Sequence, residues 1–557
     1  MPVDLYLDIL GAPFFITVDE DPAYLDRLLV NYRNAVDDVR KSTGLKDKDA
    51  LKIAILTGFS LCDELEKLKV IIEKGGEEEQ KTLQRTLNLF SRLDEAMEKL
   101  KLPDMSENAK IPISPSGSVP VSLPLLYKLQ NTVKHYEWGS PVHIPALLGA
   151  DNSQAAPWAE LWMGVHPGGP SRIAGNKTVT NNPANAPQAG ELSLRDLIAA
   201  NPERYVGRSA AKSFGGLPFL FKLLAAAKPL SIQAHPNLGQ AREGWRRENE
   251  KGIPLEAPNR NYKDNCHKPE ILCALNPFTA MCGFRPPEEI DSLLAKHFDG
   301  APRSLREGIG LLQTALNGKD PLKGFLEALF RLSPETLGEL TVYARETALP
   351  DGEWDLVSRF AGLYPGDPGI IAPLYLNLLQ LMPGEAVYLP AGVLHAYVHG
   401  FAVELMANSD NVLRGGLSSK HVDVEELLSI LDFNPYRPKI LKAQPAGNGL
   451  SRYDTPCREF SLQVMKSRGG TVFFPEMGPA IVVVTEGKLR VSPGDDKKLQ
   501  GENWTLARGE SAFIPARGKD APDKTGPGLP GNLAFSGAYT IYIASLPLEE
   551  GSSPNLS

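Results

Sequence analysis

The chain has 557 residues, which is too long for one hydrophobic core and predicts three or more domains. A hydrophobic content of 42% and a charged content of 23% are typical of soluble globular proteins. The net charge of −8 argues against a nucleic-acid partner, and no apolar run is long enough for a membrane span. The first ten residues lack the basic segment of a secretory signal, and five cysteines without a C-x-x-C pair favour a reduced, cytoplasmic protein.

Apolar residues recur at every second position at the start of the segment 3–18, which predicts a β-hairpin with a turn at 11–13. A helix should follow from Asp21, which is a suitable N-cap, and a second helix from about Asp47. The second helix has apolar residues at heptad spacing, namely Leu61, Leu65, Leu68 and Ile72. These stripes are compatible with packing inside one domain or with self-association. We favour self-association, because one hairpin and long helices offer little other surface for packing.

This layout resembles the ZapA family of cell-division proteins over about residues 1–75. The resemblance rests on the hairpin, the amphipathic helix and the run 50–69, which ends in CDELEKLK. That family forms coiled-coil oligomers and binds the bacterial tubulin-like division protein. The resemblance therefore implies a homo-oligomer formed through residues 1–103 and a bacterial division protein as a candidate partner. Gly75 and Gly76 interrupt the second helix, which departs from the unbroken coiled coil of the family.

Proline and serine dominate the segment that follows, and we interpret it as a linker. Beyond it, short apolar runs punctuated by Gly, Pro and Asn predict a β domain. Apolar side chains return to helical spacing further on, for example Phe325, Leu326 and Leu329, which predicts a helical insertion in the β domain. The predicted order is a ZapA-like module at 1–103, a linker at 104–124, a first β half at 125–285, an insertion at 286–382, a second β half at 383–440 and a C-terminal β domain at 441–557.

One motif occurs twice in the β part of the chain. Residues 383–392 read PGEAVYLPAG and residues 508–517 read RGESAFIPAR. Such a repeat predicts two copies of one architecture, and a turn, a strand and a second turn resemble the strand pairs of cupin-type jelly rolls. The first copy continues to His395, whereas no histidine occurs after His421. We therefore expect a mainly β protein with two cupin-type jelly rolls, of which only the first binds metal, preceded by the small α+β module.

The stretch LSIQAHPN at 230–237 reads as a short strand that ends at a proline. Residues two apart on a strand project from one face, so Gln233 and His235 should point the same way. Glu270 and His395 would complete a donor set of two imidazoles, one carboxylate and one amide oxygen, which suits a zinc ion. Each residue alone is more often an ordinary surface or core residue, and the combination is what favours a metal site. Such a site would stay electrophilic and could polarise a sugar carbonyl.

From Leu126 onward the chain is similar to the type I mannose-6-phosphate isomerases, also called phosphomannose isomerases. The matching segments, in the order of the family, are YEWG at 136–139, AELWMG at 159–164, LSIQAHP at 230–236, NYKD at 261–264, HKPE at 267–270, YPGD at 364–367, residues 384–397 and SDNVLRGGL at 409–417. The resemblance implies one zinc ion, bound by the four residues that donor chemistry indicates: Gln233, His235, Glu270 and His395.

The resemblance also implies a catalytic arginine at Arg414 and substrate-binding residues at Ser231, Lys268 and Lys420. Ser231 and Lys420 would contact the phosphate of a hexose 6-phosphate. A simpler alternative for Arg414 is an ion pair with Asp410, four residues earlier.

The implied reaction interconverts mannose 6-phosphate and fructose 6-phosphate through a cis-enediol. Its general base is open between Glu404 and a metal-bound water. After His-Pro-Asn the family commonly has a lysine, where this chain has Leu238. This departure keeps a second hypothesis open, in which the chain is a division-associated assembly module whose sugar-phosphate-binding half is weakly active or inactive.

Overall fold

The computed structural model describes residues 3–9, 12–18, 124–174, 192–350, 352–474, 478–494, 503–517 and 533–547. The chain separates into two compact units, Met1–Ser118 and Val119–Ser557. The helices and the heptad stripe predicted between residues 21 and 103, and the linker up to residue 123, lie outside the described residues.

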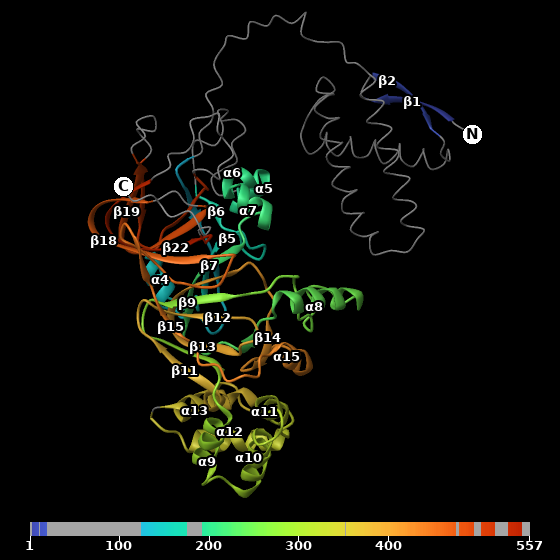
Figure 1. Cartoon of the computed structure of the whole chain (residues 1–557), viewed down its shortest axis with the longest axis vertical. Coiled ribbons are helices and arrows are strands. Elements are labelled where there is room, and N and C mark those ends of the chain that lie inside the picture. The colour runs from blue at the N-terminus through green and yellow to red at the C-terminus, as the bar shows by residue number, and fades with distance from the viewer. Residues whose placement is uncertain are drawn as a thin grey trace, which may run out of the picture. The chain divides into compact units, whose positions relative to one another are not determined.

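A β-hairpin is the described part of the first unit (Figure 1). Strand β1 (Val3–Ile9) pairs antiparallel with β2 (Ala12–Val18), which confirms the predicted hairpin. The predicted turn at 11–13 is misplaced, because Ala12 pairs with Ile9 and Pro13 with Asp8 inside the ladder. A proline is tolerated here because each strand of a two-stranded sheet has an edge that needs no N–H donor.

The second unit contains one large antiparallel sheet that carries the predicted site. Its main path, in spatial order, is β15 (Ile440–Lys442), β12 (Glu385–Leu389), β9 (Glu270–Ala274), β13 (His395–Ala407), β7 (Phe219–Ala226), β5 (Glu160–Gly164) and β4 (Thr132–Lys134). Strand β13 also pairs with β10 (Phe278–Phe284) and with β8 (Ile232–Ala234). These two strands continue the sheet to β11 (Leu376–Leu381) and β14 (Leu413–Gly416), respectively.

A second antiparallel sheet, called here the C-terminal sheet, contains β16 (Gln444–Gly447), β17 (Leu450–Arg452), β18 (Ser461–Phe474), β22 (Leu533–Ser545), β19 (Ala480–Pro493), β21 (Ser511–Ile514), β3 (Tyr127–Gln130) and β6 (Arg172–Ile173), with β20 (Trp504–Ala507) paired to β19. Strand β3 pairs with β21 although the two are almost 400 residues apart. This pairing crosses the predicted domain limits, since β3 falls in the segment expected as the first β half. A mainly β protein is nevertheless confirmed.

The two sheets share one hydrophobic core. Phe219 and Phe221 of β7 pack in the same buried cluster as Leu462 of β18 and Phe513 of β21. Because side chains alternate along a strand, Lys222 of β7 points to the opposite face of the sheet. That opposite face, which also carries Leu224, is the interior of the first jelly roll.

Helices gather beyond the β10–β11 edge of the first sheet, as Figure 1 shows. They are α9 (Pro287–Phe298), α10 (Arg303–Leu316), α11 (Pro321–Phe330), α12 (Pro334–Glu346), α13 (Glu353–Leu363), η2 (Pro368–Ile371) and α14 (Ala372–Tyr375). The predicted helical insertion is present, and Phe325, Leu326 and Leu329 are buried on one side of α11. The predicted end at residue 382 needs correction, because residues 376–381 form strand β11.

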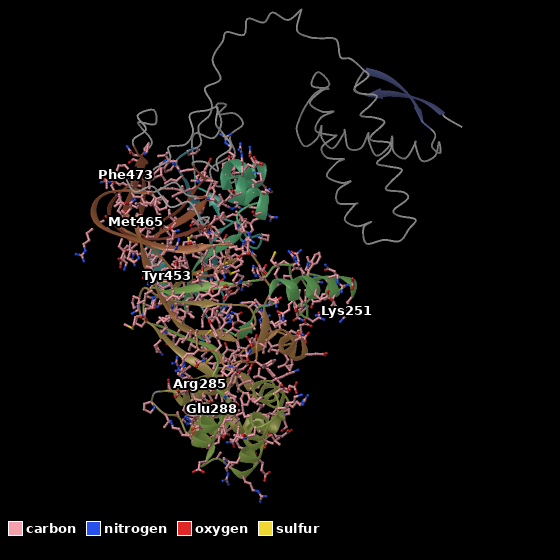
Figure 2. The ribbon with its side chains drawn as sticks, in the orientation of Figure 1. Lys251, Arg285, Glu288, Tyr453, Met465 and Phe473 are labelled. Atoms are coloured by element: carbon pink, nitrogen blue, oxygen red, sulfur yellow. The ribbon has the colours of Figure 1, made fainter. Side chains whose placement is uncertain are left out.

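Arg285 ties these helices to the sheet (Figure 2). Its Nε donates to the carbonyl of Leu376 at 2.9 Å, and its guanidinium pairs with Glu289 of α9 and, at 3.3 Å, with Glu353 of α13. The remaining described helices are α4 (His143–Leu148), α5 (Leu194–Ala200), α6 (Pro202–Val206), α7 (Arg208–Phe214), α8 (Leu238–Glu250) and α15 (Val424–Ile430). None of the helices in the described ranges is long and apolar enough to cross a membrane.

The repeated Gly-Glu motif forms the same turn twice. Gly384 and Gly509 have φ angles of 86° and 84°, a left-handed conformation that glycine adopts without strain. Glu385 and Glu510 each accept a hydrogen bond from the backbone N–H three residues earlier, at 3.0 and 2.7 Å. A strand follows each turn, β12 after the first and β21 after the second. The repeat is therefore a structural turn, and its first copy precedes β13, which begins at His395.

Candidate metal centre and active site

Three buried side chains from separate parts of the sheet converge in the first jelly roll. His235 follows β8, Glu270 begins β9 and His395 begins β13. Their candidate ligand atoms all lie within 4.8 Å of one another. Glu270 Oε1 is 3.3 Å from His235 Nε2, and Glu270 Oε2 is 3.6 Å from His395 Nε2. We call these three residues the metal group.

The hydrogen bonds of the two imidazoles indicate which nitrogen faces the group. His235 Nδ1 lies 2.8 Å from the carbonyl of Asn411, and His395 Nδ1 lies 3.0 Å from the carbonyl of Val393. A carbonyl only accepts, so each Nδ1 carries the hydrogen and each Nε2 keeps a lone pair. Both Nε2 atoms are buried without a hydrogen-bond partner among the described residues.

Buried polar atoms without partners require an explanation, and a metal ion supplies one. Burial also lowers the pKa of His235 to about 4, so the imidazole stays neutral and available as a donor. Two neutral imidazoles and a carboxylate are donors that zinc prefers, and three protein ligands leave a coordination position open. The residues present therefore fit a zinc ion.

Gln233 sits in β8 between two other predicted site residues. It is the cross-strand partner of His395 on β13 and of Arg414 on β14. Directly opposed residues of antiparallel strands project from the same face, so the sheet brings these three side chains to one side. The role of Gln233 as the fourth metal ligand stays a prediction. Ser231 lies directly before β8, and its predicted contact with the substrate also stays a prediction.

Lys268 contacts the metal group directly. Its Nζ lies 2.9 Å from Glu270 Oε1, and both side chains are buried. Burial alone would raise the pKa of Glu270, but Lys268 and His235 outweigh burial and hold that pKa well below its usual value. Glu270 is thus a carboxylate at neutral pH. The structure places Lys268 against a predicted metal ligand, and its predicted contact with the substrate stays a prediction.

A buried charge cluster that the sequence analysis did not identify lies in the same jelly-roll interior. Lys222 of β7 is the cross-strand partner of Glu404 on β13, with Nζ 2.8 Å from Glu404 Oε2 and 3.4 Å from Glu160 Oε1. Burial raises the pKa of Glu404 despite the neighbouring lysine. The hydroxyl of Tyr397 donates to Glu270 Oε2 at 3.3 Å and connects this cluster to the metal group. In the sequence, the feature that could have indicated this cluster is Lys222 itself, a single lysine inside the apolar run at 217–227.

Arg414 and Lys420 form a cationic patch beside Gln233. Burial lowers the pKa of both side chains, and the charge of Arg414 lowers that of Lys420 further, which indicates that the two are neighbours. Within the described ranges, neither forms an ion pair with a carboxylate. Asp410 instead lies 3.2 Å from His166 Nε2, so the alternative of an Arg414–Asp410 ion pair is not what the structure contains.

The turn after Arg414 is fixed by Asp367, at the end of the helical insertion. Gly416 has a φ of 130°, and a Cβ there would lie 2.8 Å from Asp367 Oδ1. The N–H of Ser418 donates to Asp367 Oδ2 at 3.3 Å. Asp367 therefore fixes the turn that follows Arg414 and joins the segments 364–367 and 409–417, which are distant in the sequence.

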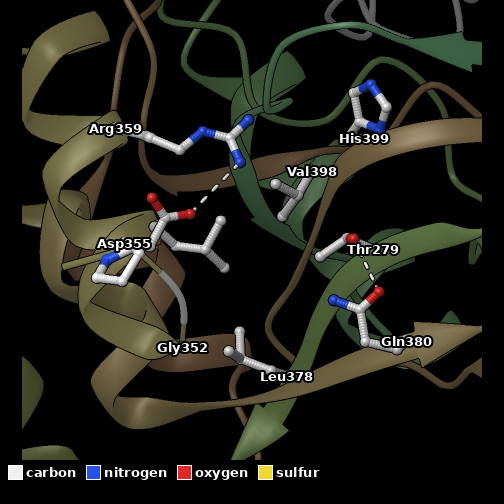
Figure 3. A pocket seen from close by; sticks show the side chains of 10 residues that line it. Thr279, Gly352, Asp355, Arg359, Leu378, Gln380, Val398 and His399 are labelled. Atoms are coloured by element: carbon white, nitrogen blue, oxygen red, sulfur yellow. Dashed lines mark hydrogen bonds and ion pairs between the residues drawn. The ribbon is translucent and has the colours of Figure 1, made fainter.

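A separate pocket of about 390 Å³ lies between α13 and strands β10, β11 and β13 (Figure 3). Several of its polar side chains pair with one another: Arg359 lies 3.8 Å from Asp355, and Thr279 donates to Gln380 at 3.1 Å. None of the three residues of the metal group lines it. The chemistry therefore belongs to the metal group and its surroundings.

Known proteins match the second unit closely. Residues 126–287 match the model for the catalytic domain of type I phosphomannose isomerase. The mannose-6-phosphate isomerase of Escherichia coli (strain K12) is 38% identical over 394 residues, which cover 70% of this chain and 95% of that protein. This chain belongs to the mannose-6-phosphate isomerase family. The corresponding enzyme of Rattus norvegicus is 33% identical over 430 residues, covering 71% of this chain and 94% of that protein.

Solved structures agree with this membership. A zinc-bound mannose 6-phosphate isomerase superposes with a TM-score of 0.65 at 33% identity, covering 76% of this chain and all of that one. A point mutant of phosphomannose isomerase from Salmonella typhimurium gives a TM-score of 0.66 with the same identity and coverage. The prediction that the chain is an isomerase of this family is confirmed, and zinc is the metal that fits its site.

The N-terminal segment matches a different family. Residues 5–101 match the model of the cell division protein ZapA, which confirms the ZapA-like module and extends it beyond residue 75. The chain thus joins a ZapA module to a phosphomannose isomerase.

Leu238, where the isomerase family commonly has a lysine, is the first residue of α8 and is 38% exposed. Asn237 caps the helix with a reciprocal hydrogen bond to Gln240, so α8 begins normally at this residue. The leucine alters the surface chemistry near the site without disturbing the local backbone.

Proposed function

We propose that the chain interconverts mannose 6-phosphate and fructose 6-phosphate by moving a proton between C2 and C1 through a cis-enediol. The observation that supports this most strongly is the pair of buried Nε2 atoms, those of His235 and His395, that face Glu270 without hydrogen-bond partners among the described residues. Next to this metal group lies a cationic patch, as a sugar phosphate requires. Gln233, His235, Glu270 and His395 would hold a zinc ion, which when bound polarises the oxygens at C1 and C2.

The phosphate would bind at the Arg414–Lys420 end of the site. Ser231 and His235 are four residues apart in extended chain, a span of about 13 Å. The strand can therefore present a phosphate contact near one end and a metal ligand near the other. Lys420 and the Ser231 hydroxyl would bind the phosphate, and this remote binding would hold C1 and C2 in position for reaction.

Arg414 would stabilise the negative charge that develops on O1 and O2. Its cross-strand partner is Gln233, one of the four proposed metal ligands, so it is close to the reacting carbons. A guanidinium remains protonated even where burial lowers its pKa, and it offers a fixed set of donors. The absence of a carboxylate partner among the described residues leaves these donors for the substrate.

Glu404 would act as the general base. Glu270 is committed to the two histidines and Lys268, and Glu160 accepts a hydrogen bond from Trp162 at 2.7 Å. Glu404 has a pKa raised by burial, which brings a carboxyl closer to the range in which it exchanges a proton near neutral pH. Lys222, bonded to it at 2.8 Å, would hold it in place.

An assay of fructose 6-phosphate formed from mannose 6-phosphate tests the proposal. Treatment with a chelator should abolish the activity and Zn²⁺ should restore it. His395→Ala should lose both the bound metal and the activity, whereas His135→Ala, at an exposed histidine outside the site, should retain both. Full activity of a metal-free preparation would rule out a role for zinc.

A second function is favoured by the ZapA match at residues 5–101. In this proposal the N-terminal module makes the chain a homo-oligomer and binds a bacterial division protein, while the isomerase half serves as a passenger or as a sugar-phosphate sensor. The isomerase assay separates the two proposals, because a sensor would bind hexose 6-phosphate without converting it.

A further inference from the structure

A side-chain hydrogen bond joins the segment that enters β18 of the C-terminal sheet to the segment that carries part of the metal group. His267 Nε2 lies 2.8 Å from Glu459 Oε1. Glu459 lies two residues before β18, and its Oε2 accepts a hydrogen bond from the thiol of Cys457 at 3.1 Å. His267 and Glu459 are 192 residues apart and both are partly buried. Neither has a place in the proposed chemistry.

His267 lies in the short segment that runs directly into β9. Lys268 and Glu270 follow it, and Lys268 contacts the Glu270 carboxylate at 2.9 Å. His267 and Lys268 are adjacent in the chain and directly precede β9, so a side chain held at 267 limits the backbone rotation that would redirect the side chain at 268. The hydrogen bond between His267 and Glu459 thus restricts the rotation of the segment that contains Lys268 and leads to Glu270.

The same segment is fixed from the other side by Asn411. The Nδ2 of Asn411 donates to the carbonyl of Cys266 at 2.8 Å, and the carbonyl of Asn411 accepts from His235 Nδ1 at 2.8 Å. The backbone before Lys268 is therefore held between the loop that orients His235 and the C-terminal sheet. Glu459 supplies the side-chain contact from that sheet.

The carboxyl group of Glu459 is ionised in this contact. The hydrogen bond from His267 is the main reason that the pKa of Glu459 is lowered to about 2, so Glu459 is a carboxylate at neutral pH. Burial raises the pKa of the Cys457 thiol, which therefore remains a neutral donor to Glu459. Imidazole and thiol together satisfy both carboxylate oxygens and define one orientation for Glu459.

We propose that His267 and Glu459 are positioning residues for the metal centre, through which the C-terminal sheet sets the orientation of Lys268 and Glu270. The C-terminal sheet contributes no residue to the metal group and would act on it through the contact between Glu459 and His267. The effect on metal binding follows from the fold alone, whereas the effect on turnover rests on the proposed isomerase function.

The test is the Glu459→Gln variant of the full chain, which keeps the shape of the side chain and removes its charge. Zn²⁺ affinity, measured by competition with a chelating indicator, should fall by about tenfold, the lower end of the effect of removing outer contacts of metal ligands. The kcat should fall by a similar factor, while KM changes less than about twofold. Glu459→Asp should recover part of both losses.

Glu510→Gln is the matched control, because it removes a comparable ion pair, Lys128–Glu510 at 3.0 Å, from the same sheet. It should leave Zn²⁺ affinity and kcat unchanged. If Glu459→Gln binds Zn²⁺ as tightly as the unmodified chain and differs only in melting temperature, the contact between His267 and Glu459 is merely structural and the proposal fails.

His267→Gln gives a second, independent variant should Glu459→Gln not fold. The double variant should lose no more Zn²⁺ affinity than either single variant, because both remove one interaction. Losses that add in full would overturn the proposal. If the unmodified chain shows no isomerase activity while Glu459→Gln still weakens Zn²⁺ binding, the isomerase function is wrong and the positioning role stands.

Discussion

At the scale of single residues, Arg414 is the most informative side chain. Arginines removed from water are normally paired, yet Arg414 has no carboxylate partner among the described residues and lies beside a second cation, Lys420. Two neighbouring cations repel one another. An anionic substrate would relieve this repulsion, which supports the proposed binding of a phosphate-bearing sugar.

Arg414→Ala should lower kcat by about 10²–10³-fold with a much smaller change in KM, because the lost donor acts on charge that exists only in the transition state. Steady-state kinetics with mannose 6-phosphate measure this. Arg303→Ala, at an exposed arginine of α10, is the control and should leave kcat and KM unchanged. A rise in KM at constant kcat would mean that Arg414 holds the phosphate instead.

Glu404→Gln should reduce kcat by about 10²–10⁴-fold, since an amide cannot accept the proton from C2. Incorporation of solvent deuterium into the sugar should fall in parallel. Glu160→Gln provides the comparison, because Glu160 shares the Lys222 partner but is not the proposed base. Equal losses in the two variants would show that both carboxylates act only through the charge of Lys222.

At the scale of secondary-structure elements, the packing of α8 supports the segment before β9, which leads to Glu270. Gly244 of α8 faces Tyr262, and a Cβ at this position would lie 2.2 Å from the ring. The Tyr262 hydroxyl donates to Glu426 of α15 at 2.6 Å. The close approach of α8 therefore joins the helix, the segment before β9 and α15 into one packed unit.

Gly244→Ala should destabilise the protein by about 1–3 kcal/mol, because the added methyl group overpacks this contact. Gly338→Ala is the matched control: Gly338 lies within α12, and a Cβ there would meet no atom within 4 Å, so alanine should stabilise the helix by about 0.5–1 kcal/mol. Chemical unfolding of both variants measures the difference. A loss of stability in both would contradict the packing argument.

The helical insertion should respond to pH through His297 of α9, which stacks on Trp354 of α13 at 4.8 Å. Burial, followed by the charge of Lys296, lowers the pKa of His297 below 6.5. Between the folded and unfolded pKa values the unfolded state binds more protons, so the free energy of unfolding should fall as pH drops through 6.5. The contribution is fully present above that pH.

His297→Phe keeps an aromatic ring on Trp354 and removes the titration. Chemical unfolding at about pH 7.5 and about pH 5.5 should show a smaller loss of stability on acidification in this variant than in the unmodified chain. Identical pH dependence in the two proteins would show that His297 is not responsible.

At the scale of the whole molecule, the chain separates into two units that match different families. Residues 5–101 match ZapA, and the E. coli relative aligns over 95% of its own length with the rest. The second unit, Val119–Ser557, is therefore the part of the chain that aligns with these isomerases.

Deleting residues 1–118 should leave kcat and KM of the isomerase nearly unchanged and reduce the oligomeric mass. Light scattering and the isomerase assay on the same sample measure both. An unchanged mass would rule out self-association through the N-terminal module. A loss of activity would show that the isomerase unit depends on the N-terminal module.

Local patterns in the sequence predicted much of the fold and the centre of the site. Strand alternation placed Gln233 and His235 on one face, helical spacing marked the insertion, and donor chemistry selected Glu270 and His395. These features depend on residues close together in the chain or on the chemistry of each side chain. The converging positions of His235, Glu270 and His395 agree with that selection.

Tertiary structure alone decided which distant side chains meet. Lys222 and Glu404 are 182 residues apart, and β3 joins β21 across almost the whole isomerase unit. The partner of Asp410 is His166 rather than Arg414, and the partner of His267 is Glu459. Periodicity reports the face on which a side chain lies, but the identity of its neighbour follows from sheet order and register. The sequence by itself therefore determined the family and selected the three residues of the metal group, because both depend on local motifs and side-chain chemistry, whereas the packing of the two sheets decided which charges surround that group.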